Sequence, residues 1–166
     1  MLDITLVCVP PRSSHHAKKI ARVGGFSRLV DKPELVAARD MLDTLLLPHQ
    51  PPAPVPGPVV LCLEFTWPWL ASQSRRTRAL GRIPHTSKPD ASNVTKTLED
   101  RLVALRFLED DRAVAALHVL KWWGPAPGIR IVVGPFVAFD AGTIGVAVPP
   151  PGVDRLDVFR EFLEVR

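Results

Sequence analysis

Carboxylates and one lysine gather at fixed spacing in the segment KPDASNVTKTLEDRLVALRFLEDDRAV, which begins at Lys88. The candidate residues, in chain order, are Asp90, Lys96, Asp100, Asp110 and Asp111. The apolar period predicts one helix over about 90–105, followed by a turn that carries the adjacent acids. Clusters of carboxylate oxygens select Mg²⁺ or Mn²⁺. A fold that brings this turn beside Asp90 would therefore gather several carboxylates and create a metal site.

Most of these residues also have an explanation that needs no chemistry. Asp90 follows Pro89 and is predicted to cap the helix, where its charge suits the helix dipole. Lys96 and Asp100 are spaced as an i, i+4 pair. One of the two adjacent acids could cap the turn, but their mutual repulsion is left unexplained. The spacing alone leaves both interpretations open.

The same residues resemble the signature of RusA-type Holliday junction resolvases. That family carries an Asp-x-Asp-Asn-x-x-Lys helix, an Asp four residues after the lysine, and then an Asp-Asp pair before a strand that ends in lysine. The matching positions here are Asp90, Asn93, Lys96, Asp100, Asp110, Asp111 and, at the strand end, Lys121. The order of predicted elements extends the resemblance over residues 3–137.

The resemblance implies a Mg²⁺-dependent endodeoxyribonuclease, with Mn²⁺ as a possible substitute, that resolves four-way DNA junctions. It further implies a homodimer acting on branched DNA, with no organic cofactor. In this interpretation Asp90 and Asp111 hold the ion, and Lys96 contacts the scissile phosphate. Asp100 and Asp110 are further candidate ligands, while Ser92 and Asn93 orient the site.

Ser92 departs from the family pattern, because it stands where the second aspartate of the motif is expected. A serine hydroxyl can hold a metal-bound water but brings no charge. Either Asp100 or Asp110 supplies the lost carboxylate, or the ion binds more weakly, or the chain binds DNA without cutting it. A non-catalytic junction-binding module and a general flap or fork nuclease therefore stay as alternatives.

Two segments are strongly basic and contain no acid. Residues 11–28 and 66–88 each hold five Lys or Arg residues, and both are predicted to be loops. Such segments suit a polyanionic partner, because neutralised phosphates release counterions. The predicted phosphate-binding residues are Lys18, Lys19, Arg75, Arg76, Arg78, Arg82 and Lys88. The alternative is that they are solvated loops that only keep the protein soluble.

The remaining patterns predict a single α+β domain over residues 1–166. We expect a strand at about 3–9, a helix from Asp31 to Pro48, a proline-rich connector at about 49–58 and a strand in VVLCLEFTW. Two strands, AVAALHVLKWW and GIRIVVGPFVAF, follow the 90–105 helix, with GPAPG between them as a hairpin connection. The expected order is β-α-β-α-β-β in one mixed sheet, with the helices on one face.

The C-terminal extension, about 138–166, is predicted to carry a short amphipathic helix from Asp154. No apolar run approaches the length of about 20 residues that a membrane span needs. Cys8 and Cys62 both lie in apolar segments and are expected to be buried thiols. We expect a cytoplasmic protein without a membrane partner.

Overall fold

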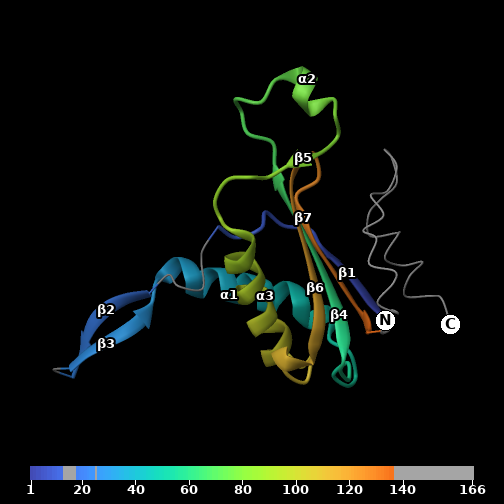
Figure 1. Cartoon of the computed structure of the whole chain (residues 1–166). Coiled ribbons are helices and arrows are strands. Elements are labelled where there is room, and N and C mark those ends of the chain that lie inside the picture. Colours follow the sequence, from blue (N-terminus) through green and yellow to red (C-terminus); the bar gives the residue numbers. More distant parts are fainter. Residues whose placement is uncertain (13–17, 25, 137–166) are drawn as a thin grey trace.

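A five-stranded mixed sheet forms the centre of the protein (Figure 1). The computed structural model describes residues 1–12, 18–24 and 26–136. The strand order is β1-β7-β4-β6-β5. The bounds are β1 Leu2–Leu6, β4 Val59–Pro68, β5 Ile83–Pro84, β6 Val114–Gly124 and β7 Gly128–Pro135.

Strand β4 lies in the middle of this sheet because nearly its whole length is apolar. Every residue from Val59 to Trp67 is buried, which requires a neighbour on each edge and cover on both faces. β4 pairs parallel with β6 and antiparallel with β7. The predicted hairpin between β6 and β7 is therefore wrong: β4 lies between them, and the GPAPG segment connects strands that are not neighbours.

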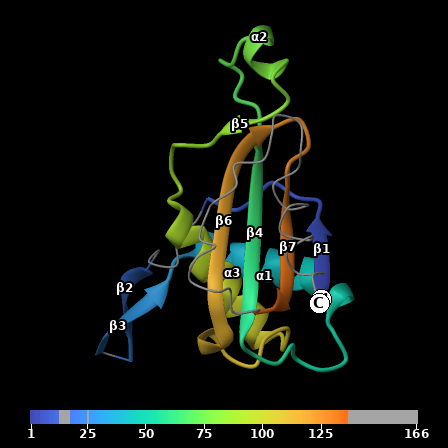
Figure 2. The same ribbon diagram turned by 45° about the vertical axis from the view of Figure 1, so that its right-hand side comes forward.

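Two helices, α1 (Pro33–Leu46) and α3 (Ala91–Ala104), cover one face of the sheet, behind the strands in the view of Figure 2. Their apolar stripes follow helical spacing and join the odd-numbered side chains of β4 in one core. The buried helix residues of this core are Leu42, Leu46, Val94, Leu98 and Leu102. The predicted α+β class and the predicted mixed sheet are confirmed.

The first basic segment is not a loop over most of its length. β2 (Lys18–Val23) pairs antiparallel with β3 (Phe26–Asp31) in a separate two-stranded sheet. Gly24 adopts a φ of +59°, which suits glycine at the turn. A glycine pair between runs that contain β-branched and aromatic residues is a hairpin signal. The interspersed cations obscured it, and the observed element order therefore differs from the predicted one.

The other connections are short or locally held. The second basic segment contains helix α2 (Arg75–Arg78) and strand β5, and is otherwise irregular. Two 3₁₀ turns, η1 (Leu47–His49) and η2 (Asp111–Ala113), follow α1 and precede β6. The proline-rich connector is pinned at Val55, whose N–H donates to the Phe107 carbonyl at 2.9 Å. The predicted C-terminal helix lies outside the described residues. No described helix is long and apolar enough to cross a bilayer.

Candidate active site

Helix α3 places the motif residues along its less buried side. Asp90 occupies the N-cap position, as predicted, but its side chain makes no capping hydrogen bond. Asn93 and Lys96 are half-buried, and Ser92 is exposed. Thr97 is buried, and its hydroxyl donates to the Asn93 carbonyl one turn earlier. The helix thus presents Lys96 to the turn that precedes β6.

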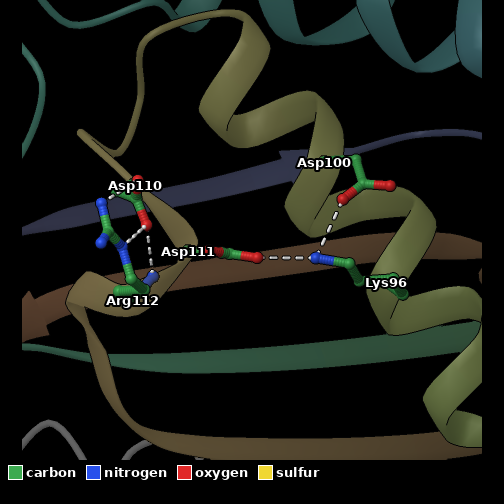
Figure 3. Close-up of polar contacts among 5 residues, drawn as sticks. All are labelled: Lys96, Asp100, Asp110, Asp111 and Arg112. Carbon is green, nitrogen blue, oxygen red and sulfur yellow. Dashed lines mark hydrogen bonds and ion pairs between the residues drawn. The ribbon is translucent and has the colours of Figure 1, made fainter.

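Lys96 lies between two aspartates that come from different elements (Figure 3). Its Nζ is 2.7 Å from Oδ2 of Asp111 and 3.0 Å from Oδ1 of Asp100. These contacts raise the pKa of Lys96, the bond to Asp111 first and the bond to Asp100 second. Both pairs remain accessible, because the side chains of Lys96 and Asp111 are 39% and 50% exposed. A fixed cation and two carboxylates therefore face solvent together.

Asp110 turns away from this group. Its carboxylate accepts from the Arg112 backbone N–H at 2.9 Å, and from Nε and Nη2 of the same residue at 2.8 and 3.0 Å. Figure 3 shows Asp110 directed at Arg112 while Asp111 points toward Lys96. The bonds to Arg112 hold the pKa of Asp110 well below its usual range. The turn-capping explanation is thus confirmed for Asp110.

Asp90 lies at the other end of the motif, near the far end of β6. Lys121 donates from Nζ to the Ser87 carbonyl at 2.9 Å and also to the Pro89 carbonyl, so it holds the chain that enters α3. Burial lowers the pKa of Lys121, and the charge of Asp90 opposes this. Asp90 and Lys96 are separated by about 9 Å along the helix axis. Lys96, rather than Asp90, is therefore the helix residue that reaches Asp111.

The structure thus brings the helix and the acidic turn together across fifteen residues, through Lys96 and Asp111 and not through Asp90. The sequence model described as Endodeoxyribonuclease RusA matches residues 9–134. The chain belongs to the RusA endodeoxyribonuclease family. No curated protein matches it. The match spans both basic segments, α3 and the acidic turn. It also includes every strand of the sheet but β1, and leaves out only the last residue of β7.

The RusA family implies a divalent metal, and the residues present meet part of its needs. Among residues 1–12, 18–24 and 26–136, no three His, Cys, Asp or Glu side chains lie close enough to hold one ion. Mg²⁺ commonly uses one or two carboxylates and takes its other ligands from water and substrate phosphates. Asp111, and Asp90 with its carboxylate unused in capping, provide such oxygens. Their chemistry suits this open kind of site, although Lys96 and not Asp90 is the helix residue in contact with Asp111.

The predicted phosphate-binding residues divide into two groups. Lys18, Lys19, Arg75, Arg76 and Lys88 are exposed. Arg78 and Arg82 are exposed too, but Arg78 donates to the Gln73 and Leu70 carbonyls at 3.1 and 2.9 Å, and Arg82 pairs with the buried Glu64. The last two guanidinium groups therefore fix the second basic segment to itself and to β4.

An aromatic cluster that sequence reasoning missed supports the entry to α3. His85 is 4% exposed and lies between Trp123 and Trp67, with ring centroids 4.1 and 4.4 Å away. Neither ring nitrogen has a hydrogen-bond partner among the described residues. Burial lowers its pKa, and the charges of Lys121 and Arg12 add to this. No sequence signal distinguished this histidine from others in a basic loop.

Two acids were also missed. Glu99 lies beside the Lys96 group, and its partial burial raises its pKa against the opposing charge of Lys96. Glu64 is a buried acid within β4, where it meets Arg82. A single carboxylate inside the apolar run VVLCLEFTW was a usable signal, because a buried charge needs a partner.

Proposed function

We propose that this RusA family member is a cytoplasmic, homodimeric, Mg²⁺-dependent nuclease that resolves four-way DNA junctions by paired phosphodiester hydrolysis. Membership of the family supports nuclease activity on branched DNA. A two-fold dimer suits a junction because the junction offers two equivalent strands. We propose that the enzyme prefers junctions over flaps and forks, and a comparison of cleavage of these substrates tests this preference.

The observation that carries the proposal is the contact between Lys96 and Asp111 at 2.7 Å. It joins the two parts of the family motif on an accessible surface, with a cation and a carboxylate side by side. A structural ion pair of this kind contributes little to stability when exposed. A role in recognising and cutting a phosphodiester explains the pairing better than a role in folding.

The residues divide the chemistry as follows. Asp111 and Asp90 would hold the divalent ion, which would supply an activated water and offset negative charge on the phosphate. Lys96 stays protonated because its pKa is raised, so it acts as a fixed cation toward the developing charge rather than as a proton donor. Lys121 positions Asp90 by holding the Ser87 and Pro89 carbonyls.

The test is cleavage of a synthetic four-way junction, first with Mg²⁺ and then with Mn²⁺. We expect paired symmetric nicks, and we expect Asp111→Asn to slow them by about 100-fold or more, as for loss of a charge acting at the transition state. Glu109→Gln, an exposed acid two residues away, is the matched control and should keep the rate. Linear, flap and fork substrates at the same salt concentration separate a resolvase from a general nuclease.

A second candidate is a junction-binding module without cleavage, and one observation favours it. Lys96 already engages both Asp111 and Asp100, while Ser92 brings no charge to the motif. One lysine thus already offsets part of the charge of both acids. Tight junction binding with no nicks in either metal, together with no uptake of Mg²⁺ or Mn²⁺ in calorimetry, would favour the module and contradict the nuclease.

A further inference from the structure

The β2–β3 hairpin extends away from the body of the protein (Figure 1). Several of its apolar side chains are exposed. Ile20 and Leu29 lie directly opposite one another and are 75% and 66% exposed. Phe26, beside the turn, is 73% exposed. A two-stranded hairpin alone is marginally stable in water. Such an arm, carrying exposed apolar groups, indicates a partner that covers it.

The cations of the hairpin are distributed over both of its faces. The register pairs Lys18 with Asp31 and Arg22 with Ser27 on one face, and Lys19 with Val30 and Arg28 with Ala21 on the other. All four cations are exposed, and none has an ion pair within the described part of the chain. The single acid of the hairpin, Asp31, is engaged by Arg39.

The base of the hairpin is fixed rather than loose. Only Lys32 separates β3 from α1, and the Asp31–Arg39 pair joins the hairpin end to that helix. Helix α1 is in turn anchored to the body by Leu35 and Leu42, which are buried. The hairpin is therefore held at a set angle to the sheet that carries the candidate active site.

We propose that this hairpin is a duplex-binding arm that lies in a groove of one DNA arm, away from the scissile phosphate. The groove of B-DNA admits a two-stranded ribbon and presents phosphates on both walls, which matches cations on both faces. A second copy of the chain fits less well, because lysine is depleted at the centre of protein interfaces and the four cations would meet four like charges. Exposed Phe26 suits contact with bases where the duplex opens.

The inference rests on the proposed DNA substrate but not on cleavage, so it is tested without divalent metal. Binding of labelled junction and linear duplex is measured in EDTA at several KCl concentrations. The test variant combines Lys18→Gln, Lys19→Gln, Arg22→Gln and Arg28→Gln. Each lost phosphate contact should reduce the slope of log affinity against log salt by about 0.9, so the full variant should lose up to about 3.6. Affinity for both DNAs should fall at least tenfold.

Arg106→Gln is the matched control, because Arg106 is an exposed cation that follows α3. The slope of log affinity against log salt for this variant should equal that of the unaltered protein. Where the fourfold variant fails to fold by circular dichroism, Arg28→Gln alone should still reduce the slope by about 0.9. An unchanged slope in the folded hairpin variants would overturn the proposal. So would a smaller assembly in sedimentation for Ile20→Ser with Leu29→Ser, since that assigns the arm to a second copy.

Absence of nicking with metal would contradict the proposed nuclease and leave this result intact. If the hairpin variants bind DNA with a reduced slope of log affinity against log salt and the unaltered protein makes no nicks, the protein is a DNA-binding module whose hairpin binds DNA as proposed.

Discussion

The two basic segments are alike in composition and unlike in structure. Each carries five cations and no acid, yet one forms the β2–β3 hairpin and the other, the folded-back segment, runs out through α2 and returns through β5, which pairs with β6 (Figure 1). In the second segment Arg78 and Arg82 are bound to carbonyls and to Glu64. In the hairpin Lys19 and Arg28 project to solvent. Charge counted along a sequence therefore does not tell which cations are available to a partner.

The largest effect that follows from this difference is on stability. Arg82→Met should lower the free energy of unfolding by about 2 kcal/mol, because the buried Glu64 loses its ion pair with Arg82. Urea denaturation measures it. Arg75→Gln, an exposed cation of the same segment, is the control and should stay within about 0.5 kcal/mol.

The same variant sharpens the comparison on the DNA side. Arg82→Met should leave the salt dependence of DNA binding unchanged, since its guanidinium is held by Glu64. A drop in the slope of log affinity against log salt by about 0.9 would show that Arg82 contacts phosphate after all. The double variant with Glu64→Leu should recover part of the lost stability.

A second difference is the aromatic cluster around His85 at the end of the folded-back segment. This cluster predicts that the stability of the protein depends on pH. His85 is neutral in the fold, and its pKa is lowered, so the unfolded chain takes up a proton first as the pH falls. Its contribution to stability is present above the unfolded pKa of about 6.5 and declines as the pH falls toward the folded value. For one proton, the free energy of unfolding changes by at most about 1.4 kcal/mol per pH unit.

His85→Phe should remove this slope and raise stability at pH 7 by about 1 kcal/mol, because the ring still stacks and two unpaired nitrogens are gone. Thermal unfolding between pH 5 and pH 8 measures both effects. His118→Gln is the comparison, because burial also lowers the pKa of His118. If the Phe variant kept the full slope, the pH dependence would have to come from other groups.

Sequence patterns identified the elements of the site better than their arrangement. The apolar period located α3, and spacing predicted the N-cap position of Asp90 and the Lys96–Asp100 pair. These are local relations that helix geometry sets. Which of two adjacent acids faces Lys96 is not local, because it depends on Asp110 capping η2 and binding Arg112.

The sheet shows the same limit. Strands β4, β6 and β7 were predicted from their apolar runs, but their neighbours were not. Proximity along the chain suggested a β6–β7 hairpin, whereas the burial of β4 from Val59 to Trp67 places it between them. Burial on both edges is a property of the assembled sheet. A strand with apolar residues on both of its faces, as in VVLCLEFTW, is the sequence signal that favours a central place.

The smallest expected effect concerns the hairpin and distinguishes its two possible partners. Ile20→Thr with Leu29→Thr replaces the exposed cross-strand pair by residues that also favour strands. Since neither side chain is buried by the described chain, the free energy of unfolding should change by less than about 0.5 kcal/mol. Urea denaturation at two protein concentrations measures it. Val60→Thr, a buried position of β4, is the control and should cost about 1–3 kcal/mol.

A loss above about 1.5 kcal/mol in the hairpin variant would mean that these side chains are covered in solution, since exposed substitutions rarely cost that much. If that loss also depended on protein concentration, the cover would be a second copy of the chain, because association stabilises a fold by mass action. The hairpin would then resemble the folded-back segment, because its side chains would already be in contact with protein. A small, concentration-independent change keeps the two segments distinct, because Arg78 and Arg82 hold the second segment in place while the cations of the hairpin stay free to bind DNA.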